Sequence, residues 1–387
     1  MTALPTHDAQ RLQQIAQARQ SLLADGTELT HALASAWYDR AWLLHSWQRC
    51  LAQGRSPTEP LVFNPVPAHA LARAAQAHAP LLAAARAELE HLGALLAPIR
   101  YFALLTDAGG CVLATGGVID HSEPHTHAIA RVGVDLSEAN IGTSAIGAAL
   151  TERMPVWLHR GEHFFQHNSV YSCAGAPLLG PQGQCLGMLD VTGVQVAEHP
   201  ELKHLVAQSA RRIENALLLA QPHRLRLQLA WPSGWAVSSD AGEGLLCLDA
   251  DGLVTGANPA ARAMLPALGL PGPAQPLHAG DLFAQPWESL FDLARQGEAA
   301  LVPLWSGLRL RVSACLAHAT HPGATPAPQP VSKVAATRPL KLLETELIHQ
   351  AVRDAGGRVD VAARALGLSR ATVYRRLSRR SSDRPAG

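Results

Sequence analysis

The sequence predicts an α+β protein of several domains, and three observations lead to this fold class. The chain has 387 residues, 48% of them hydrophobic and 16% charged, which is enough apolar material for more than one core. Strand patterns alternate with helix patterns between about residues 71 and 317, whereas both ends of the chain are helix-like. A Pro/Ala-rich segment without periodicity, residues 318–338, then predicts a linker before a last, basic unit.

The N-terminal region, residues 1–70, is expected to be helical. The stretch "ALASAWYDRAWLLHSWQRCLAQG" is apolar at helical spacing and stops at Gly54, where "RSPTEP" breaks the pattern. Residues 70–97 are rich in Ala and Leu, which predicts one long helix that ends before Pro98.

The segment 71–220 alternates strands and helices. "RYFALLTDAGGCVLATGG" predicts a strand, a D-A-G-G turn and a second strand. "NIGTSAIGAALTERMPVWL" predicts a helix and a short strand, and "SCAGAPLLGPQGQCLGMLDVTG" predicts a hairpin that turns at 181–183. "PELKHLVAQSARRIENALLLA" is amphipathic and closes the unit, so we expect one α+β domain here.

A smaller α+β unit is expected over residues 235–317. "EGLLCLDADGLVTGANPAARAML" predicts a strand, a D-A-D-G turn, a second strand and a helix. "LVPLWSGLRLRVSACLA" predicts its later strands.

Three short helices are expected in the basic C-terminal unit, residues 339–380. The first precedes Gly356 and Gly357, with an apolar stripe at Leu343, Leu347, Ile348, Ala351 and Val352. The second carries Val359, Ala362, Ala363 and Leu366, and Gly367 allows a sharp turn. Ser369 is a good N-cap for the third, in which Val373 and Leu377 face inward.

The charge distribution supports nucleic-acid binding only locally. The whole chain has a formal net charge of +1, but six arginines and no acidic residue lie between 364 and 380. From Lys341 onward the chain has ten Lys or Arg and five Asp or Glu, which is a net charge of +5. The rest of the chain therefore has a net charge of about −4. A third helix with such a surface can place arginines in a major groove, where they bind guanine or phosphate. The alternative is a solvated basic helix without a partner.

The segment "GLSRATVYRRL" resembles the Fis-type helix-turn-helix that ends many bacterial enhancer-binding regulators. The resemblance implies a homodimer, formed through the helix at about 340–355, and double-stranded DNA with an inverted-repeat operator as the partner. We assign DNA contact to Ser369, Arg370, Thr372, Tyr374, Arg375, Arg376 and Arg379. Tyr374 has an equal alternative, which is to pack in the core of the unit.

The stretches "NIGTSAIG", "EHF", "CAGAPL" and "GQCLGMLDVTG" resemble the GAF sensor domain of the acetoin-catabolism activator family, whose N-terminal region "SWQRCLAQG" also matches. A pocket between a sheet and its covering loops is a usual place for a small-molecule effector. The candidates for its lining are Trp157, His163, Phe164, Phe165, Tyr171 and Cys173. For any one of the aromatic residues, plain core packing is the competing interpretation.

The His and Cys residues of this domain suggest two other chemistries. His159, His163 and His167 have a spacing that would align them on one helix face, and His121, His125 and His127 lie in a nearby loop. No Asp, Glu or Cys completes a ligand set, so we expect no metal, haem or other cofactor. Cys173 and Cys185 flank one hairpin, which leaves a cysteine redox enzyme as an alternative.

The unit around 243–317 resembles a PAS domain, most closely in its opening strands. We expect it to mediate dimerisation or signal relay, because it is short and directs few polar residues at a pocket.

The activators in question carry an AAA+ ATPase that acts on sigma-54 RNA polymerase, and this sequence offers no place for one. It contains no GxxxxGK[ST], and none of its three lysines, Lys203, Lys333 and Lys341, follows a glycine. We therefore expect a non-enzymatic, ligand-responsive transcriptional regulator, which acts by repression or by direct contact with RNA polymerase. The alternative is an accessory module that heterodimerises with a full-length activator. Six scattered cysteines, no signal peptide and no membrane-spanning run favour a cytoplasmic protein without a membrane partner.

Overall fold

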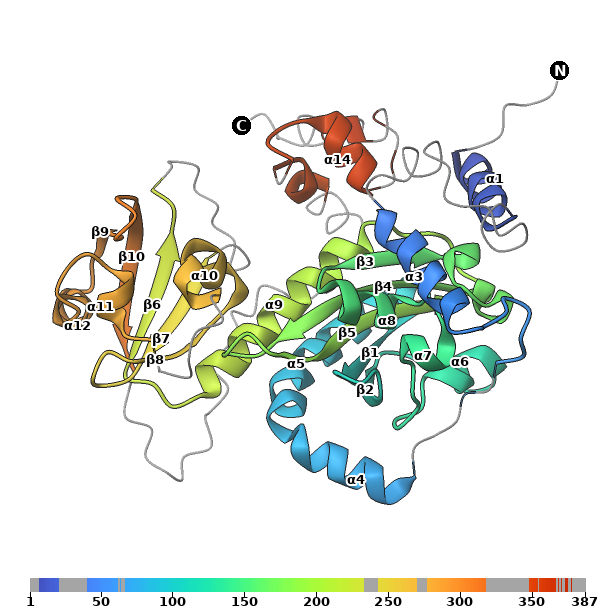
Figure 1. The fold of residues 1–387 in the computed structure, drawn as a ribbon, viewed down its shortest axis with the longest axis horizontal. Helices are drawn as coiled ribbons and strands as arrows, with labels where there is room; N and C mark the ends of the chain where they lie inside the picture. Colours follow the sequence, from blue (N-terminus) through green and yellow to red (C-terminus); the bar gives the residue numbers. More distant parts are fainter. Residues whose placement is uncertain are drawn as a thin grey trace, which may run out of the picture.

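The computed structural model describes residues 7–20, 40–61, 63, 67–232, 243–269, 277–317, 348–353, 355–366, 368, 370, 373, 374 and 377. Two five-stranded antiparallel sheets, each with helices, and a helical C-terminal unit confirm the predicted α+β class (Figure 1). No helix in these described ranges is long and apolar enough to cross a bilayer.

The first sheet has the strand order β2-β1-β5-β4-β3. The strands are β1 (Tyr101–Asp107), β2 (Val112–Gly116), β3 (Val156–His159), β4 (Tyr171–Leu179) and β5 (Cys185–Val194). Both predicted hairpins are confirmed. Their turns place Gly110 and Gly183 at φ +86°, a left-handed conformation that glycine adopts without strain.

Helices cover both faces of this sheet (Figure 1). The helices α5 (Ala79–Leu96) and α9 (Leu202–Ala220) share a core with one face, which includes Leu105, Leu189 and Val191. The opposite face shares its core with α1 (His7–Arg19), α3 (Ala41–Ala52), α6 (Pro124–Ile129), α7 (Glu138–Ile141) and α8 (Ala145–Glu152). The described part of the N-terminal region is thus helical, as predicted, and its helices belong to the core of the first sheet.

The prediction of one long helix over residues 70–97 is wrong in one respect, because the structure has two helices with a break at His78. The helix α4 (Ala68–Ala77) ends before His78, and α5 begins again with Pro80 in its first turn. Proline has no N–H to donate and its ring collides with the preceding turn, so it starts a helix better than it continues one.

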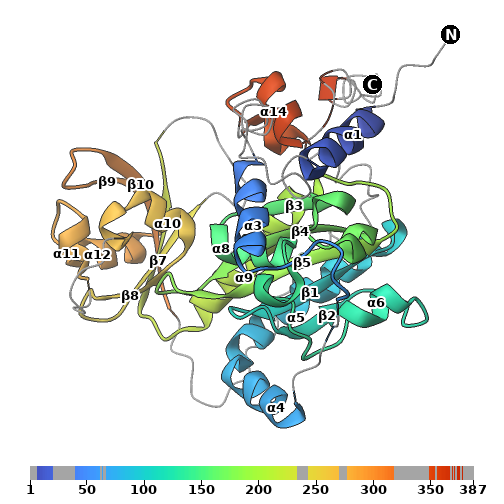
Figure 2. The same cartoon turned by 45° about the vertical axis from the view of Figure 1, so that its right-hand side comes forward.

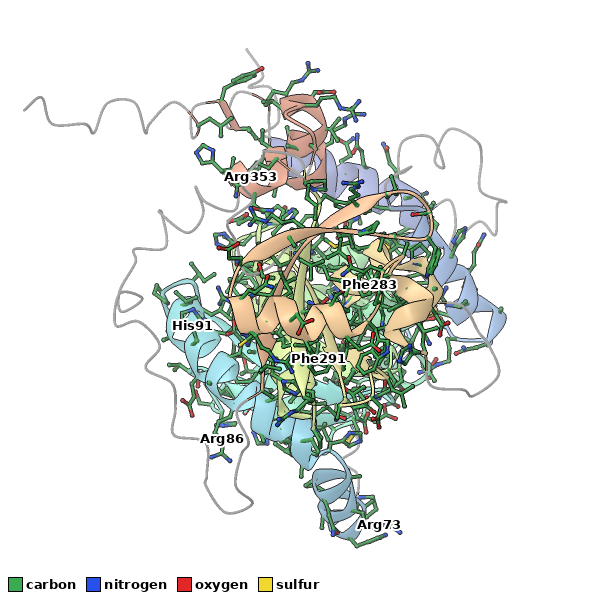
Figure 3. The ribbon with its side chains drawn as sticks, turned by 90° about the vertical axis from the view of Figure 1, so that its left-hand side faces the viewer. Arg73, Arg86, His91, Phe283, Phe291 and Arg353 are labelled. Carbon is green, nitrogen blue, oxygen red and sulfur yellow. The ribbon has the colours of Figure 1, made fainter. Side chains whose placement is uncertain are left out.

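The second sheet has the order β8-β7-β6-β10-β9. Its strands are β6 (Leu225–Ala230), β7 (Gly244–Leu248), β8 (Val254–Ala257), β9 (Ala299–Pro303) and β10 (Arg309–Leu316). The helices α10 (Pro259–Met264), α11 (Ala279–Leu282) and α12 (Glu288–Gln296) pack on one face around the fully buried Phe283, with Phe291 of α12 beside it (Figure 3). The central strand β6 precedes the expected range 235–317, so this unit starts earlier than the sequence suggested.

The two sheets are joined by α9 and by the turn between β4 and β5. Leu218, near the end of α9, packs against Leu245 and Cys247 of β7. At the turn, Pro181 O accepts hydrogen bonds from Ala257 N (2.9 Å) and from the Arg262 guanidinium (2.6 Å). Figure 2 shows α9 running from the first sheet toward β7 and β8. The hairpin and α9 therefore link the two units mechanically.

The described part of the C-terminal unit has its own small core, formed by Ile348, Ala351, Ala362, Ala363, Leu366 and Val373. The chain turns at Gly356 and Gly357, which both have positive φ, and α14 (Val359–Leu366) follows. Leu368 and Leu377 pack against this core, as the spacing predicted.

Candidate functional site

A small cavity lies between the first sheet and the helices on its α8 side. Its volume of about 20 Å³ accommodates roughly one water molecule. Apolar side chains make up half of the wall: Phe63, Leu104, Ile129, Leu136, Ile141, Ala145 and Ile146. The polar lining is Ser144, His163, Asn168, Tyr171, Cys173, Asp190 and Thr192.

The polar side chains of the sheet form a buried hydrogen-bonded chain. The hydroxyl of Thr192 donates to Asp190 Oδ2 and lies 3.3 Å from Cys173 Sγ. Cys173 Sγ in turn lies 3.6 Å from His163 Nε2. Asp190 is opposite Gly175 of β4, and Thr192 is opposite Cys173, so the β-sheet register brings this chain together.

Two oxygen atoms in the wall accept no hydrogen bond from any described residue. They are Asp190 Oδ1 and Asn168 Oδ1, and the two residues are 0% and 1% exposed. The other groups of both side chains are engaged, since Asn168 Nδ2 donates to Ile141 O at 3.1 Å. Buried acceptors without a donor cost free energy, so these two atoms are sites where a water or a ligand in the cavity can form a hydrogen bond.

Burial controls the protonation of the cavity wall. It raises the pKa of Asp190 to about 7, and the hydrogen bond from Thr192 opposes this only in part. It lowers the pKa of His163 to about 4, so the imidazole is neutral at physiological pH. Burial also raises the pKa of the Cys173 thiol well above its ordinary value, so this cysteine is not a thiolate nucleophile. The wall thus carries little net charge near neutral pH.

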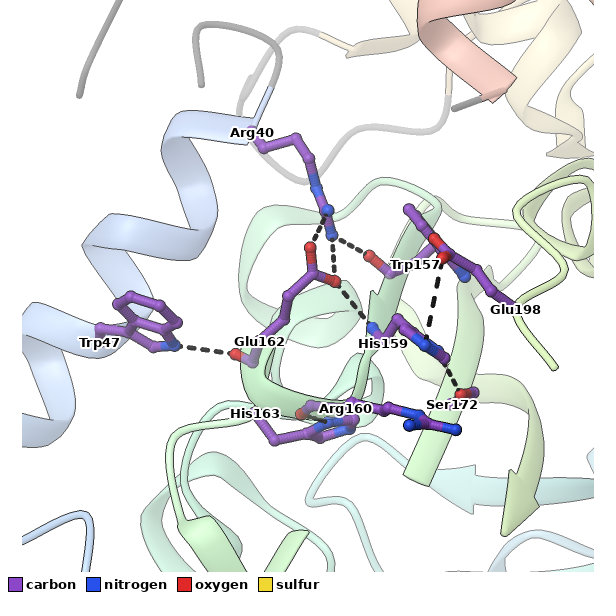
Figure 4. A network of polar contacts seen from close by, with 9 residues as sticks. All are labelled: Arg40, Trp47, Trp157, His159, Arg160, Glu162, His163, Ser172 and Glu198. Carbon is purple, nitrogen blue, oxygen red and sulfur yellow. Dashed lines mark hydrogen bonds and ion pairs between the residues drawn. The ribbon is translucent and has the colours of Figure 1, made fainter. Parts of the chain in front are cut away.

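The N-terminal helices α1 and α3 hold the segment that carries His163, and Figure 4 shows the contacts made by Arg40 and Trp47. The fully buried Glu162 carboxylate is paired with Arg40 at the start of α3, and it accepts the His159 N–H at 2.7 Å. Trp47 Nε1 donates to Glu162 O at 2.8 Å. The Arg19 guanidinium of α1 donates to the carbonyl oxygens of Gly161, His163 and Phe164. A movement of His163 would therefore disturb the hydrogen bonds that α1 and α3 make to this segment.

The structure separates the six residues predicted to line a ligand site. His163, Tyr171 and Cys173 line the cavity. Phe164 and Phe165 are fully buried and pack edge to face with each other in the core without lining it. Trp157 lies toward the opposite face of the sheet, where it packs beside the α5–α9 core and below the Arg40 guanidinium. The sequence analysis missed Asn168, Asp190 and Thr192, although an Asp within an apolar strand was a visible signal.

The histidine spacing does not give a common helix face. His159 ends β3, His163 follows the 3-10 turn Arg160–Glu162, and His167 lies in a second 3-10 turn, Gln166–Val170. No group of three or more His, Cys, Asp or Glu side chains in the described part of the chain is arranged to hold a metal ion.

The cysteine pair is also not formed. Cys173 lies opposite Thr192, whereas Cys185 lies opposite Leu179 at the other end of the hairpin. Six residues of strand separate the two positions, about 20 Å at the usual rise per residue, so no disulfide can join them.

Only part of the candidate DNA interface falls within the described residues. Arg370 is exposed, and Tyr374 is 60% exposed, so the alternative of a core position for Tyr374 is wrong. Ser369, Thr372, Arg375, Arg376 and Arg379 lie outside the described residues. Val373, which lies between Arg370 and Tyr374, is fully buried, whereas the other two side chains are exposed.

Two family models match the chain. Residues 67–217 match the GAF domain, and residues 339–379 match the bacterial regulatory protein, Fis family. The chain thus contains a GAF domain, which carries the cavity, and a Fis-family helix-turn-helix, which carries Arg370 and Tyr374.

The chain spans well under half the length of the curated relatives that it matches. The chain is 30% identical to the acetoin catabolism regulatory protein of Cupriavidus necator, over 65% of this chain and 38% of that protein. It is 26% identical to the acetoin dehydrogenase operon transcriptional activator AcoR of Bacillus subtilis, over 46% and 29% respectively. The solved E. coli DhaR(N)-DhaL complex matches 72% of this chain and 99% of that one, with 17% identity and a TM-score of 0.43.

Proposed function

We propose that this chain, which carries a GAF domain and a Fis-family helix-turn-helix and is similar to regulators of acetoin catabolism, is a ligand-responsive transcriptional regulator. It binds an inverted repeat in double-stranded DNA as a homodimer, and a small molecule in the GAF cavity controls this binding. The observation that carries the proposal is the coexistence in one chain of the cavity with two unpartnered buried oxygens and a DNA-binding unit. The regulators of acetoin genes among its relatives support a small oxygenated metabolite as the effector.

The proposed signal path follows the hydrogen bonds of the β4–β5 hairpin. The effector meets Asp190 and Cys173 on the hairpin β4–β5, whose turn is bonded to Ala257 and Arg262 of the second unit. The second unit, which we take to be PAS-like, and α9 would relay the change to the dimer. Effector binding then shifts the population of dimer geometries, and only one geometry matches half-sites about one helical turn of DNA apart.

No ATP hydrolysis is part of this proposal, because these 387 residues contain no phosphate-binding GxxxxGK[ST] loop. Regulation would then take the form of repression or of direct contact with RNA polymerase.

Genome-wide footprinting of the full chain at two salt concentrations tests the proposal, since phosphate contacts make all DNA binding salt-dependent. We expect a few sharp inverted repeats near promoters. The Arg370→Ala variant should lower operator affinity by about 1–3 kcal/mol if Arg370 contacts a base. The control is Arg295→Ala on α12, where the arginine pairs with Asp292 on the surface, and it should leave the footprints unchanged. Diffuse binding that only follows salt would contradict a sequence-specific regulator.

A further inference from the structure

The second sheet exposes most of one face. Along its strands every second side chain, such as Leu227 and Leu310, points into the core shared with α10, α11 and α12, and the others point away from it. On the outward side the end of α9 packs on β7 through Leu218. The outward side chains of β6, β10 and β9, here called the open face, are exposed or half-buried in the described structure. They include Arg226, Gln228, Ala299, Leu301, Arg309 and Arg311.

The charge of the open face is opposite to that of the unit around it. Residues 221–317 contain six Arg, no Lys and eight Asp or Glu, which is a net charge of −2. The five strands of the sheet contain no Asp or Glu, and three of the six arginines, Arg226, Arg309 and Arg311, lie on the open face. None of these three forms an ion pair with another described residue. Three positive charges thus gather on one side of an acidic unit.

The arginines form a row beside an exposed apolar side chain. Arg309 and Arg311 are two residues apart on β10, so their Cα atoms are roughly 7 Å apart. Arg226 lies opposite Cys315, six residues along β10 from Arg309, which makes the row about 20 Å long. Leu301 of β9 lies opposite Arg311 and is 52% exposed. Arginine next to exposed apolar surface is a composition typical of protein–protein interfaces.

We infer that the open face binds an acidic amphipathic helix of another protein. A row of about 20 Å matches roughly 13 residues of α-helix at 1.5 Å per residue. Carboxylates four residues apart on one helix face are about 6 Å apart, close to the spacing of Arg309 and Arg311. Each guanidinium can donate two parallel hydrogen bonds to a carboxylate. Apolar side chains on the same face of the helix would pack on Leu301.

Two other occupants fit the open face less well. A second copy that docks through the same face about a two-fold axis would bring the arginines of the two copies together, and like charges oppose this contact. A DNA duplex extends beyond the face, so its phosphates would also approach the exposed Glu298, which directly precedes β9. A helix of roughly 13 residues stays within the row of arginines. It also uses the apolar surface of Leu301, which a phosphate does not.

A helix bound at the open face would lie next to the end of α9. Arg226 lies opposite Cys247 of β7, and Leu218 of α9 packs on that cysteine. The same helix α9 packs on the sheet of the GAF domain. A partner at the open face would therefore contact a region that is joined to the GAF domain by one continuous helix.

Synthetic helices of one length test the chemistry of the partner. The probe is an alanine-based peptide of about 14 residues with glutamates four residues apart and leucines on the same face. Fluorescence anisotropy with the full chain should show saturable binding. The same peptide with Gln in place of Glu should bind about tenfold more weakly, because the charge attraction is lost.

Charge reversal on the protein shows whether the named arginines cause this preference. The double variant Arg309→Glu with Arg311→Glu should lose the glutamate peptide and bind the same helix with Lys in place of Glu. A folding defect would weaken both peptides, so the exchange of preference is the readout. Arg295→Glu is the matched control, since Arg295 is an exposed arginine of the same unit on α12, which packs on the other face of the sheet. It should leave the affinities for both peptides unchanged.

Equal affinity for the Glu and Gln peptides, no saturable binding, or a double variant that keeps the Glu peptide would overturn the inference. So would two results that assign the open face to another occupant. A double variant that changes from dimer to monomer in analytical ultracentrifugation would assign it to a second copy. A double variant with a smaller salt dependence of binding to duplex DNA than the Arg295→Glu control would assign it to DNA. The footprints of the wild-type chain depend on none of these results, so the inference and the proposed function fail separately.

Discussion

At the scale of single residues, two buried carboxyl groups lie on opposite faces of one sheet with different roles. Asp190 points into the cavity with one oxygen unpaired, whereas Glu214 holds the backbone of Leu179 at the end of β4. Burial raises the pKa of both to about 7. A carboxyl group with a pKa near 7 is partly neutral at physiological pH. A ligand that donates a hydrogen bond to it favours the charged form, so ligand binding can change its protonation.

The pH dependence of stability can be tested with Asp190→Asn. The folded-state pKa of Asp190, about 7, lies above its unfolded value of 3.8, so its contribution is fully present below pH 4 and is lost as the pH rises to 7. Asn cannot ionise, so we expect the variant to be close to wild type at pH 4.5. At pH 8 it should be more stable by about 2–4 kcal/mol, as a shift of roughly three pKa units implies. Urea unfolding at the two pH values measures the difference.

His163 does not produce this pattern, because its pKa is lowered to about 4 and its effect has the opposite sign. Its contribution is present above pH 6.5 and is lost as the pH falls toward 4. It is the same in wild type and variant, so it cancels in the comparison. A constant stability difference across the pH range would show that Asp190 is not a buried, ionisable group.

At the residue scale, three of the six residues predicted to line the cavity do so, and most of the wall was not predicted. His163, Tyr171 and Cys173 were predicted and do line it. Asp190 and Asn168 were missed, because a motif resemblance emphasises aromatic and sulfur-containing residues, and the facing of a strand residue depends on register. Residues two apart on a strand lie on the same face of the sheet. Since Met188 of β5 is buried in the core, Asp190 could have been predicted to lie on that same buried face.

At the scale of elements, the β4–β5 hairpin is both a cavity wall and the contact with the second unit. Its turn accepts hydrogen bonds from Ala257 N and from Arg262, and Arg262 is half-buried and also donates to Leu268 O at 2.7 Å. The charged donor fixes the turn against α10. A change at Asp190 in β5 can therefore reach α10 through a strand and one short turn.

Arg262→Ala tests this link. The loss of a charged hydrogen bond at a half-buried site should cost about 1–3 kcal/mol of local stability. We expect the Ala257 amide, which donates to Pro181 O, to exchange its hydrogen faster while amides in β1 keep their rates. Arg295→Ala, which removes an exposed arginine from α12, serves as the control. Unchanged exchange at Ala257 would mean that the turn does not depend on Arg262.

Local patterns predicted the individual elements better than the assembly. Both hairpins of the first sheet, α9 and the opening of the second unit follow from periodicity and turn residues, which act over a few positions. The strand β6 was missed because "LRLQLA" is short and gains its stability from β7 and β10 on either side. The packing of α1 and α3 on the segment 160–165 depends on contacts more than one hundred residues apart, which no local pattern encodes.

At the scale of the whole molecule, sensing and DNA binding must be linked by a reciprocal free energy. If the effector changes the affinity for the operator by some factor, the operator changes the affinity for the effector by the same factor. We expect a factor between about 5 and 150, typical of such coupling. Titrating the full chain with acetoin in the presence and absence of operator DNA measures one side, and DNA binding with and without acetoin measures the other.

Asp190→Leu separates a sensor from a passive core in this measurement. The side chain lies in the GAF core and Arg370 lies in a unit with a core of its own, so the variant should keep the effector-free affinity for DNA. It should lose the response to acetoin, because the differential contact that shifts the population is gone. A variant that still responds would place the effector elsewhere in the chain. A wild-type protein that binds acetoin with the same affinity on and off DNA would show that the cavity and the helix-turn-helix are not coupled by one conformational equilibrium.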